Sequence, residues 1–313
     1  MAFDRLIERI AEMQNPTVAG LDPKLEYVPE SIRSKAFSQY GRTLDGAASA
    51  ILEFNMKIID ALCDIVPAVK PQCAYYEMYG WQGMKALHDT VAYAKSKGMF
   101  VITDGKRNDI GSTMAAYAAA HLGETDVCGK KFSAFGADAL TVNGYLGSDG
   151  VQPLLDVCRE QNKGIFVLVK TSNPSSDELQ DQAFEGGELL YEAMGRFCEE
   201  WGASLPGKYG YSGVGAVVGA TFPAQLAELR NSMAHTFFLV PGYGTQGGSA
   251  ESVAPAFGKN GCGAVVNASR SILCAWKAQN DSQENFAECA HREAISMRDS
   301  IIKQVGKISL EKV

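Results

Sequence analysis

The chain has 313 residues and a formal net charge of −7; 46% of its residues are hydrophobic and 21% are charged. These values are ordinary for a globular enzyme with a large core, and the negative charge argues against nucleic acid as a partner. No apolar run is long enough to span a membrane. The charged, amphipathic segment 1–16 lacks the apolar centre of a signal peptide, so we expect a cytoplasmic protein.

Cysteine and histidine spacing gives no sign of a metal site. The eight cysteines form no CxxC pair, and none of the four histidines stands in an HExxH motif. Scattered cysteines in apolar stretches are typical of reduced core thiols. We therefore expect neither disulfides nor a bound metal.

Short apolar runs alternate along the chain with longer segments of helical periodicity, such as WQGMKALHDTVAYAKSKG at 81–98. Nearly continuous apolar runs are typical of parallel strands that are buried on both faces. We expect strands at 17–22, 65–70, 99–106, 139–143, 164–171, 213–220, 235–242 and 263–269.

Eight strand–helix units in succession predict an α/β fold, a (β/α)₈ TIM barrel, as a single domain over residues 1–313. Such a barrel needs about 250 residues, so about 60 are surplus. We assign the surplus to the long first connection, 23–64, and to the polar, turn-rich segment 174–188. A doubly wound open sheet is the rival architecture, because pattern alone does not determine topology.

Charged and polar residues recur at the carboxyl ends of the expected strands, where this fold builds its active sites. Asp22 ends the first strand, Lys70 the second, and Asp104 and Lys106 the third. The fifth strand ends in Lys170, Thr171 and Ser172. This recurrence at one end of otherwise apolar strands predicts a polar cavity there.

The segment DGKRNDIGST, residues 104–113, holds the densest cluster of charges. Asp104 and Lys106 are two residues apart and share a face of the strand, while Asp109 and Thr113 share a face of the helix that follows. A lysine between two carboxylates keeps its proton, which suits a general acid. The alternative is a salt-bridge network with a purely structural role.

Two segments near the C-terminus predict a phosphate site. PGYGTQGGS, residues 241–249, is a glycine-rich turn whose backbone amides can hold an anion ahead of a helix. NASRSI, residues 267–272, adds Arg270, a guanidinium that can bind phosphate in a bidentate manner. The loops after strands seven and eight are a frequent phosphate site in this fold.

These residues resemble a known family. DGKRNDIGST is similar to the DxKxxDI…T signature of the orotidine 5′-phosphate decarboxylases, and GLDP, VKPQ, KTSNP, PGYGTQGG and SR extend the resemblance over most of the chain. The length resembles the longer bacterial branch. The resemblance implies a TIM barrel that converts orotidine 5′-phosphate to uridine 5′-phosphate (UMP) and CO₂ in pyrimidine biosynthesis, without metal or organic cofactor.

The resemblance also implies roles for the residues at the first three strand ends. Lys106 would protonate C6 of the pyrimidine once CO₂ leaves. Asp104 would lie beside the substrate carboxylate and disfavour it. Lys70 would hold the charge network, and Asp22 would hydrogen-bond the ribose.

The same resemblance implies further substrate contacts and a homodimer. Asp109, as a catalytic group, and Thr113, as a substrate contact, would reach into the neighbouring subunit's site. Ser172 would contact the pyrimidine edge. The phosphate would be held by Gln246, Gly247, Ser269 and Arg270.

Two alternatives remain open from the sequence. A related sugar-phosphate decarboxylase acts on 3-keto-L-gulonate 6-phosphate and places an acid for magnesium at the second strand end, where this chain has Lys70. A non-catalytic nucleotide-binding barrel would need the phosphate site but not Lys106 with its flanking acids.

Overall fold

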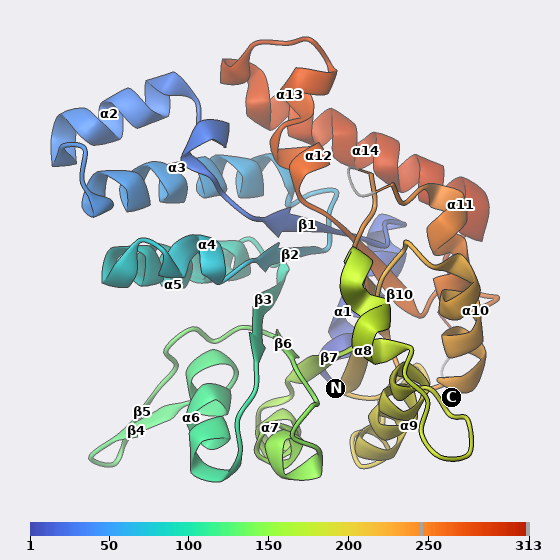
Figure 1. Ribbon diagram of the computed structural model, residues 1–313. Helices are drawn as coiled ribbons and strands as arrows, with labels where there is room; N and C mark the ends of the chain where they lie inside the picture. The colour runs from blue at the N-terminus through green and yellow to red at the C-terminus, as the bar shows by residue number, and fades with distance from the viewer. Residues whose placement is uncertain (245–246, 311–313) are drawn as a thin grey trace.

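A closed barrel of eight parallel strands forms the centre of the molecule (Figure 1). The computed structural model describes residues 1–244 and 247–310. Around the barrel the strands follow the order β1-β10-β9-β8-β7-β6-β3-β2. Their bounds are β1 Thr17–Leu21, β2 Ala68–Pro71, β3 Phe100–Arg107, β6 Ala139–Val142, β7 Gly164–Lys170, β8 Val214–Val218, β9 Phe238–Val240 and β10 Ala264–Ala268. All eight predicted strands and the predicted barrel are confirmed, and the open-sheet alternative is wrong.

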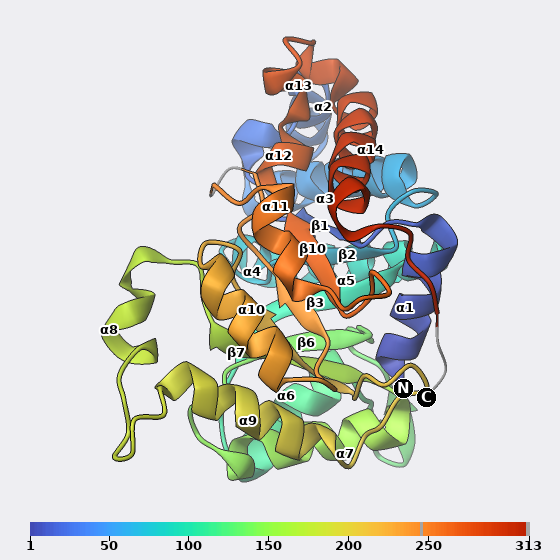
Figure 2. The same cartoon turned by 90° about the vertical axis from the view of Figure 1, so that its right-hand side faces the viewer.

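Helices surround the barrel, as Figures 1 and 2 show from two sides. Their bounds are α1 Ala2–Met13, α2 Glu30–Tyr40, α3 Leu44–Leu62, α4 Ala74–Glu77, α5 Gly80–Ser96, α6 Gly111–His121, α7 Ser148–Gln161, α8 Asp177–Gln180, α9 Leu190–Gly202, α10 Pro223–Ser232, α11 Ala250–Val253, α12 Arg270–Leu273, α13 Ala275–Ala278 and α14 Phe286–Val305. Short 3₁₀ turns occupy η1 Leu25–Tyr27, η2 Pro174–Ser176, η3 Ala254–Ala256 and η4 Gln283–Asn285. The helix expected over 81–98 corresponds to α5.

Alternate strand residues divide the core into two parts. Side chains at even steps along a strand point to the same face. In β3, Phe100 and Ile102 point into the barrel interior, whereas Val101 packs outward against the helices. At the amino-terminal end of the barrel, α1 contributes Phe3, whose ring centroid lies 4.7 Å from that of Phe166. The side chains of α1 therefore close the barrel at the amino-terminal end of the strands.

The two segments predicted to hold the surplus residues both carry structure of their own. Segment 23–64 contains η1, α2 and α3, and segment 174–188 contains η2 and α8. Figure 2 shows α8 projecting from the barrel on the side opposite α1. These insertions lengthen the chain without interrupting the eight barrel units.

An antiparallel hairpin, β4 Thr125–Val127 with β5 Lys130–Phe132, was not predicted. It extends beside α6 (Figure 1, lower left). Cys128 and Gly129 form its two-residue turn with φ of 51° and 87°, as a type I′ turn requires. Every residue of both strands is exposed, so the apolar pattern that reveals a buried strand is missing.

Within residues 1–244 and 247–310, no helix is long and apolar enough to cross a membrane. All eight cysteines lie in this described part of the chain, and all are free thiols.

Candidate active site

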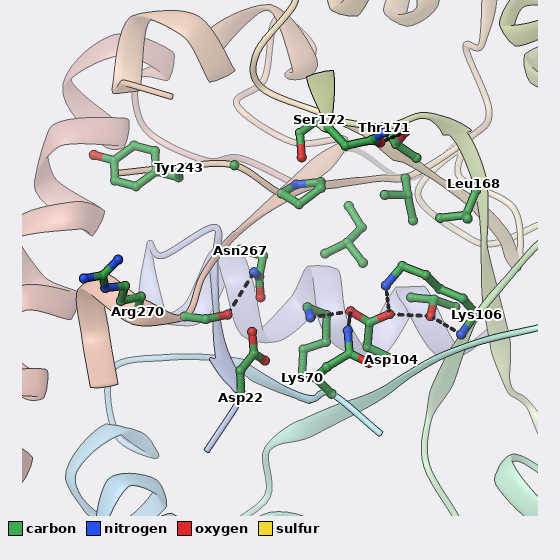
Figure 3. Close-up of a pocket in the computed structure, with 18 of the residues that line it drawn as sticks. Asp22, Lys70, Asp104, Lys106, Leu168, Thr171, Ser172, Tyr243, Asn267 and Arg270 are labelled. Carbon is green, nitrogen blue, oxygen red and sulfur yellow. Dashed lines mark hydrogen bonds and ion pairs between the residues drawn. The ribbon is translucent and has the colours of Figure 1, made fainter. Parts of the chain in front are cut away.

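A cavity of about 760 Å³ opens at the carboxyl ends of the barrel strands (Figure 3). Its lining combines inward-facing strand residues with residues of the loops that follow β1, β2, β7, β9 and β10. Four cations and two carboxylates face it, namely Lys24, Lys70, Lys106, Arg270, Asp22 and Asp104. The predicted polar cavity at the strand ends is thus present, with an excess of positive charge.

The alternation of strand residues explains which side chains reach the cavity floor. Lys70 lies two residues after the inward-facing Ala68, and Asp104 lies two after Ile102. Thr141 and Asn267 follow Ala139 and Val265 in the same way. The top inward layer of the barrel is therefore polar on β2, β3, β6 and β10, although the layer below it is apolar.

Asp104 is the centre of a hydrogen-bond network on one side of this floor. Its Oδ2 accepts from Lys70 Nζ at 2.6 Å and from Gln72 Nε2 at 3.0 Å. Its Oδ1 accepts from Lys106 Nζ at 2.6 Å and from Thr141 Oγ1 at 2.7 Å. Four donors on two oxygens fix the carboxylate in one orientation, as Figure 3 shows.

The two lysines of the network differ in exposure. The Lys70 side chain is 5% exposed, whereas that of Lys106 is 45% exposed and reaches into the cavity. Burial acts to raise the pKa of Asp104, but the charges of Lys70 and Lys106 outweigh it and hold that pKa well below its ordinary value. Burial likewise opposes the charge on Lys70, yet Asp104 and Asp22 raise its pKa. Lys70 thus anchors a charged carboxylate, and Lys106 is the cation available to a ligand.

The backbone at Lys106 adopts a conformation unusual for a residue with a side chain. Its φ is 45°, and the register between β3 and β6 shifts between Thr103 and Arg107. The Lys106 N–H donates to Thr141 Oγ1 at 3.0 Å. A left-handed residue persists only where its surroundings hold it. Thr141 therefore positions both Lys106 and Asp104.

The opposite side of the floor is apolar. Leu168, Val217 and Leu239, from β7, β8 and β9, line the cavity there with Pro241. Ser172 and Thr171 stand above this side in Figure 3. Such a wall suits the face of a planar ring, while the polar groups above it suit the ring edge.

A third group of polar residues lies where β10 and β1 end. Ser269 and Arg270 follow β10, and Asp22 follows β1. Asp22 Oδ1 is buried and has no hydrogen-bond partner among the residues described. Arg270 is exposed at the rim. An anionic group at the rim and a hydrogen-bond donor deeper in the cavity would satisfy this end of the site.

Several predicted site residues lie outside this lining. Asp109 and Thr113 belong to the connection after β3 and to the start of α6, away from the cavity of their own chain. Gly247 is exposed, with φ of 91°, and is not part of the lining. Gln246 falls outside the described residues.

Lys170 was expected among the polar strand ends that line the site, but it does not line the cavity. The pairing of β7 with β8 shifts register between Leu168 and Lys170, so the side chain turns out of the barrel. Lys170 is fully buried and pairs with Asp181 at 2.5 Å. It holds the segment after β7 against the barrel instead of lining the cavity.

Sequence reasoning missed Thr141, Gln72, Gln180 and Asn267, all of which line the cavity. Strict alternation from Ala139 would have found Thr141, and alternation from Val265 would have found Asn267. Gln180 reaches the cavity because α8 folds back: its Nε2 donates to Thr171 Oγ1 at 2.7 Å. No local pattern predicts that contact.

The described part of the chain contains no group of three or more histidine, cysteine, aspartate or glutamate side chains placed to hold a metal ion. In the cavity, Asp104 is paired with Lys70 and Lys106, and the charge of Asp22 also acts on Lys70. The lining carries four cations against two carboxylates, which favours an anionic ligand.

Known proteins resemble this chain over most of its length. The family described as "Orotidine 5'-phosphate decarboxylase / HUMPS family" matches residues 33–284. The orotidine 5′-phosphate decarboxylase of Rhodopirellula baltica is 44% identical over 289 residues, covering 91% of this chain and 93% of that protein. That of Caldicellulosiruptor saccharolyticus is 41% identical over 298 residues, covering 95% and 97%.

Solved structures give the same result. Leishmania donovani OMP decarboxylase is 30% identical with a TM-score of 0.71, and the match covers 95% of this chain and 99% of that one. The Methanocaldococcus jannaschii orotidine 5′-monophosphate decarboxylase, complexed with the inhibitor BMP, has a TM-score of 0.58 at 19% identity, which supports the fold alone. With the matched family model and the near full-length identity of its relatives, the chain belongs to the orotidine 5′-phosphate decarboxylase / HUMPS family.

Proposed function

We propose that this protein decarboxylates orotidine 5′-phosphate to UMP and CO₂, the reaction that completes UMP biosynthesis. The observation that carries the proposal is the placement of Asp104 between Lys70 and Lys106 at the floor of a cavity whose rim holds Arg270. The related sugar-phosphate decarboxylases are disfavoured because Lys70 occupies the second strand end, where their magnesium ligand would stand.

In the proposed reaction the bond between C6 and the carboxylate carbon breaks, and its electron pair remains on C6. The ammonium of Lys106 lies next to that position, stabilises the developing negative charge and then gives C6 its proton. The lysine recovers a proton from water, so one proton is consumed for each CO₂ released. This chemistry requires no redox change.

Asp104 contributes in two ways. It stays ionised because Lys70 and Lys106 lower its pKa, so a substrate carboxylate placed beside it meets a like charge. Two charges about 4 Å apart interact by roughly 4 kcal/mol at an effective dielectric near 20, so repulsion accounts for only part of the acceleration. The larger part comes from Asp104 holding the ammonium of Lys106 against C6, with both groups preorganised before the substrate arrives.

The remaining contacts would bind different parts of the substrate along the cavity. The apolar side formed by Leu168, Val217 and Leu239 would face the pyrimidine ring, with Ser172 at its edge. Asp22 would accept from the ribose. The phosphate would lie near Arg270 and Ser269, with Gln246 and the amide of Gly247 completing its contacts. Binding the phosphate far from C6 can drive closure of the surrounding loops and lower the barrier.

We also propose a homodimer in which each subunit completes its partner's site. Asp109 and Thr113 lie outside their own cavity, on the side where β2, β3 and β6 end. Large exposed apolar side chains occur in the segments after these strands: Met78, Trp81, Ile110, Val127 and Phe132. A second copy covering them would bring Asp109 and Thr113 to the neighbouring cavity. The eight free thiols suit a reducing compartment, and we propose the cytoplasm.

The decarboxylation is tested by following the loss of orotate absorbance with orotidine 5′-phosphate in the presence of a metal chelator. Turnover is expected without metal, and Lys106→Ala should lower it by at least about 1000-fold. Lys85→Ala is the matched control, because Lys85 is an exposed lysine on α5 paired with Asp89. No turnover here, together with magnesium-dependent turnover of 3-keto-L-gulonate 6-phosphate, would replace the proposal with the sugar-phosphate reaction.

The shared site is tested by mixing two inactive variants. A heterodimer of Lys106→Ala with Asp109→Ala has one site carrying both changes and one carrying neither, so random exchange should restore about a quarter of the wild-type sites. Mixing each variant with itself is the control. If the mixture stays inactive while sedimentation shows that subunits have exchanged, Asp109 does not act in the partner's site.

A further inference from the structure

Asn267 is a polar residue in the inward layer of β10 to which the proposed reaction assigns no role. It is 8% exposed and lines the cavity. The preceding inward residue, Val265, belongs to the apolar barrel core. An amide at this height is costly to bury unless its donor and acceptor groups find partners.

The partners that the structure provides for Asn267 are incomplete. Its Nδ2 donates to Ser269 Oγ over a long 3.4 Å, while its Oδ1 is buried and lacks a partner within the described residues. Asp22 Oδ1, in the same cavity, is in the same condition. The two residues belong to neighbouring strands, because Asn267 lies on β10 and Asp22 follows β1, which pairs with β10. Two unsatisfied acceptors therefore face the same cavity.

The position of this acceptor pair indicates what would satisfy it. Figure 3 shows Asn267 and Asp22 extending into the part of the cavity between Arg270 and the Lys70–Asp104 network. A nucleotide with its phosphate at Arg270 and its base at Lys106 would place its ribose there. Ribose carries two neighbouring hydroxyls, which are the donors that two adjacent acceptors require.

We propose that Asn267 is a ribose-binding residue whose Oδ1 accepts a hydrogen bond from one hydroxyl of the nucleotide, beside the contact made by Asp22. The inference rests on the proposed function, because it takes the ligand to be a ribonucleotide. It makes Asn267 a determinant of the preference for ribose over deoxyribose at this site.

A competing role would be indirect. Rotation of the amide by 180° would point Nδ2 at Asp22, and Asn267 would then only orient that carboxylate. In that case Asp22 alone would make the contact that produces the preference for ribose. Removing Asp22 would abolish the preference, whereas a direct contact from Asn267 would leave part of it in place.

The experiment measures binding of UMP, 2′-deoxy-UMP and 3′-deoxy-UMP by titration calorimetry. Asn267→Ala should weaken UMP about five- to twentyfold and should weaken one of the two deoxy ligands by much less, because that ligand lacks the hydroxyl in question. The control is Asn143→Ala: Asn143 follows β6, its Oδ1 accepts from Tyr145 N at 2.9 Å, and it lies outside the cavity lining. Unchanged UMP affinity in Asn267→Ala overturns the inference.

The Asp22→Ala variant keeps the test decisive if Asn267→Ala does not fold. A remaining preference of at least threefold for UMP over one deoxy ligand supports a second ribose contact, and its loss on adding Asn267→Leu, which keeps the side-chain size but has no acceptor, assigns that contact. No remaining preference in Asp22→Ala overturns the inference. Failure of the wild-type protein to bind UMP refutes the proposed function and the inference together, whereas the other negative outcomes leave the decarboxylase reaction intact.

Discussion

Replacement of Thr141 by valine tests whether the hydroxyl on β6 organises the charged side of the site. The substitution keeps the shape of a side chain that is 1% exposed and removes two hydrogen bonds. One runs from Thr141 Oγ1 to the Asp104 carboxylate at 2.7 Å, and the other from the Lys106 N–H to the same oxygen at 3.0 Å. A hydrogen bond to a charged group contributes about 1.5–3 kcal/mol, and a buried N–H left unpaired costs about 1–3 kcal/mol.

If the lost interactions act mainly in the transition state, Thr141→Val should raise its free energy by about 2–4 kcal/mol, which lowers kcat/KM by about 30- to 1000-fold. The assay is orotidine 5′-phosphate decarboxylation with kcat and KM determined separately, and kcat should carry most of the loss. Thr103→Val is the matched control: Thr103 is fully buried on β3, contacts Ala139 O at 3.4 Å and lies outside the cavity lining. A Thr141→Val enzyme within threefold of the wild type would refute the reasoning.

Three further predictions concern stability and packing. Burial lowers the pKa of His121 from 6.5 to about 4, so between these pH values the unfolded chain binds a proton that the folded chain does not bind. The free energy of unfolding should therefore fall by about 3 kcal/mol as the pH drops from 6.5 to 4. In urea titrations at several pH values, His121→Phe should remove this pH-dependent component. Asp181→Ala leaves the fully buried Lys170 without its ion-pair partner and should lower the free energy of unfolding by about 3 kcal/mol. The double variant Asp181→Ala/Lys170→Met should regain most of that stability, because no unpaired charge is then buried. A double variant no more stable than the single one would contradict the argument. In Gly20→Ala the new Cβ would lie 1.8 Å from Ser269 Oγ, so Ser269 must move. We expect the free energy of unfolding, measured by heat or urea, to fall by about 1–3 kcal/mol and the KM to rise. An unchanged KM would show that Ser269 does not contact the substrate.

Periodicity made the barrel predictable because each strand is buried on both faces. Every residue of β1, β8 and β10 is buried, and such continuous apolar runs differ from the helical periodicity between them. The β4–β5 hairpin was not predicted, because every residue of its two strands is exposed. Exposed strands have no apolar face and leave only their turn as a signal.

The charged residues of the cavity were predictable for a related reason. A charged residue at the end of an apolar run is easily recognised in the sequence, and the parallel strands of a barrel bring their carboxyl ends to one face. Asp22, Lys70, Asp104 and Lys106 were all found in this way, and all four line the cavity. Their meeting follows from the topology of the fold.

The sequence by itself thus determined the barrel, its open end and the charged residues placed there. Only the tertiary structure decided which polar residues accompany them: Lys170 leaves the site because of a register shift, Gln180 enters it through α8, and Asn267 adds an amide to the cavity lining. Alternation along one strand can be read from the sequence, but bulges and the contacts between distant loops depend on packing among elements far apart in the chain. The charge network is therefore visible in the sequence, and its positioning groups become visible only in the folded molecule.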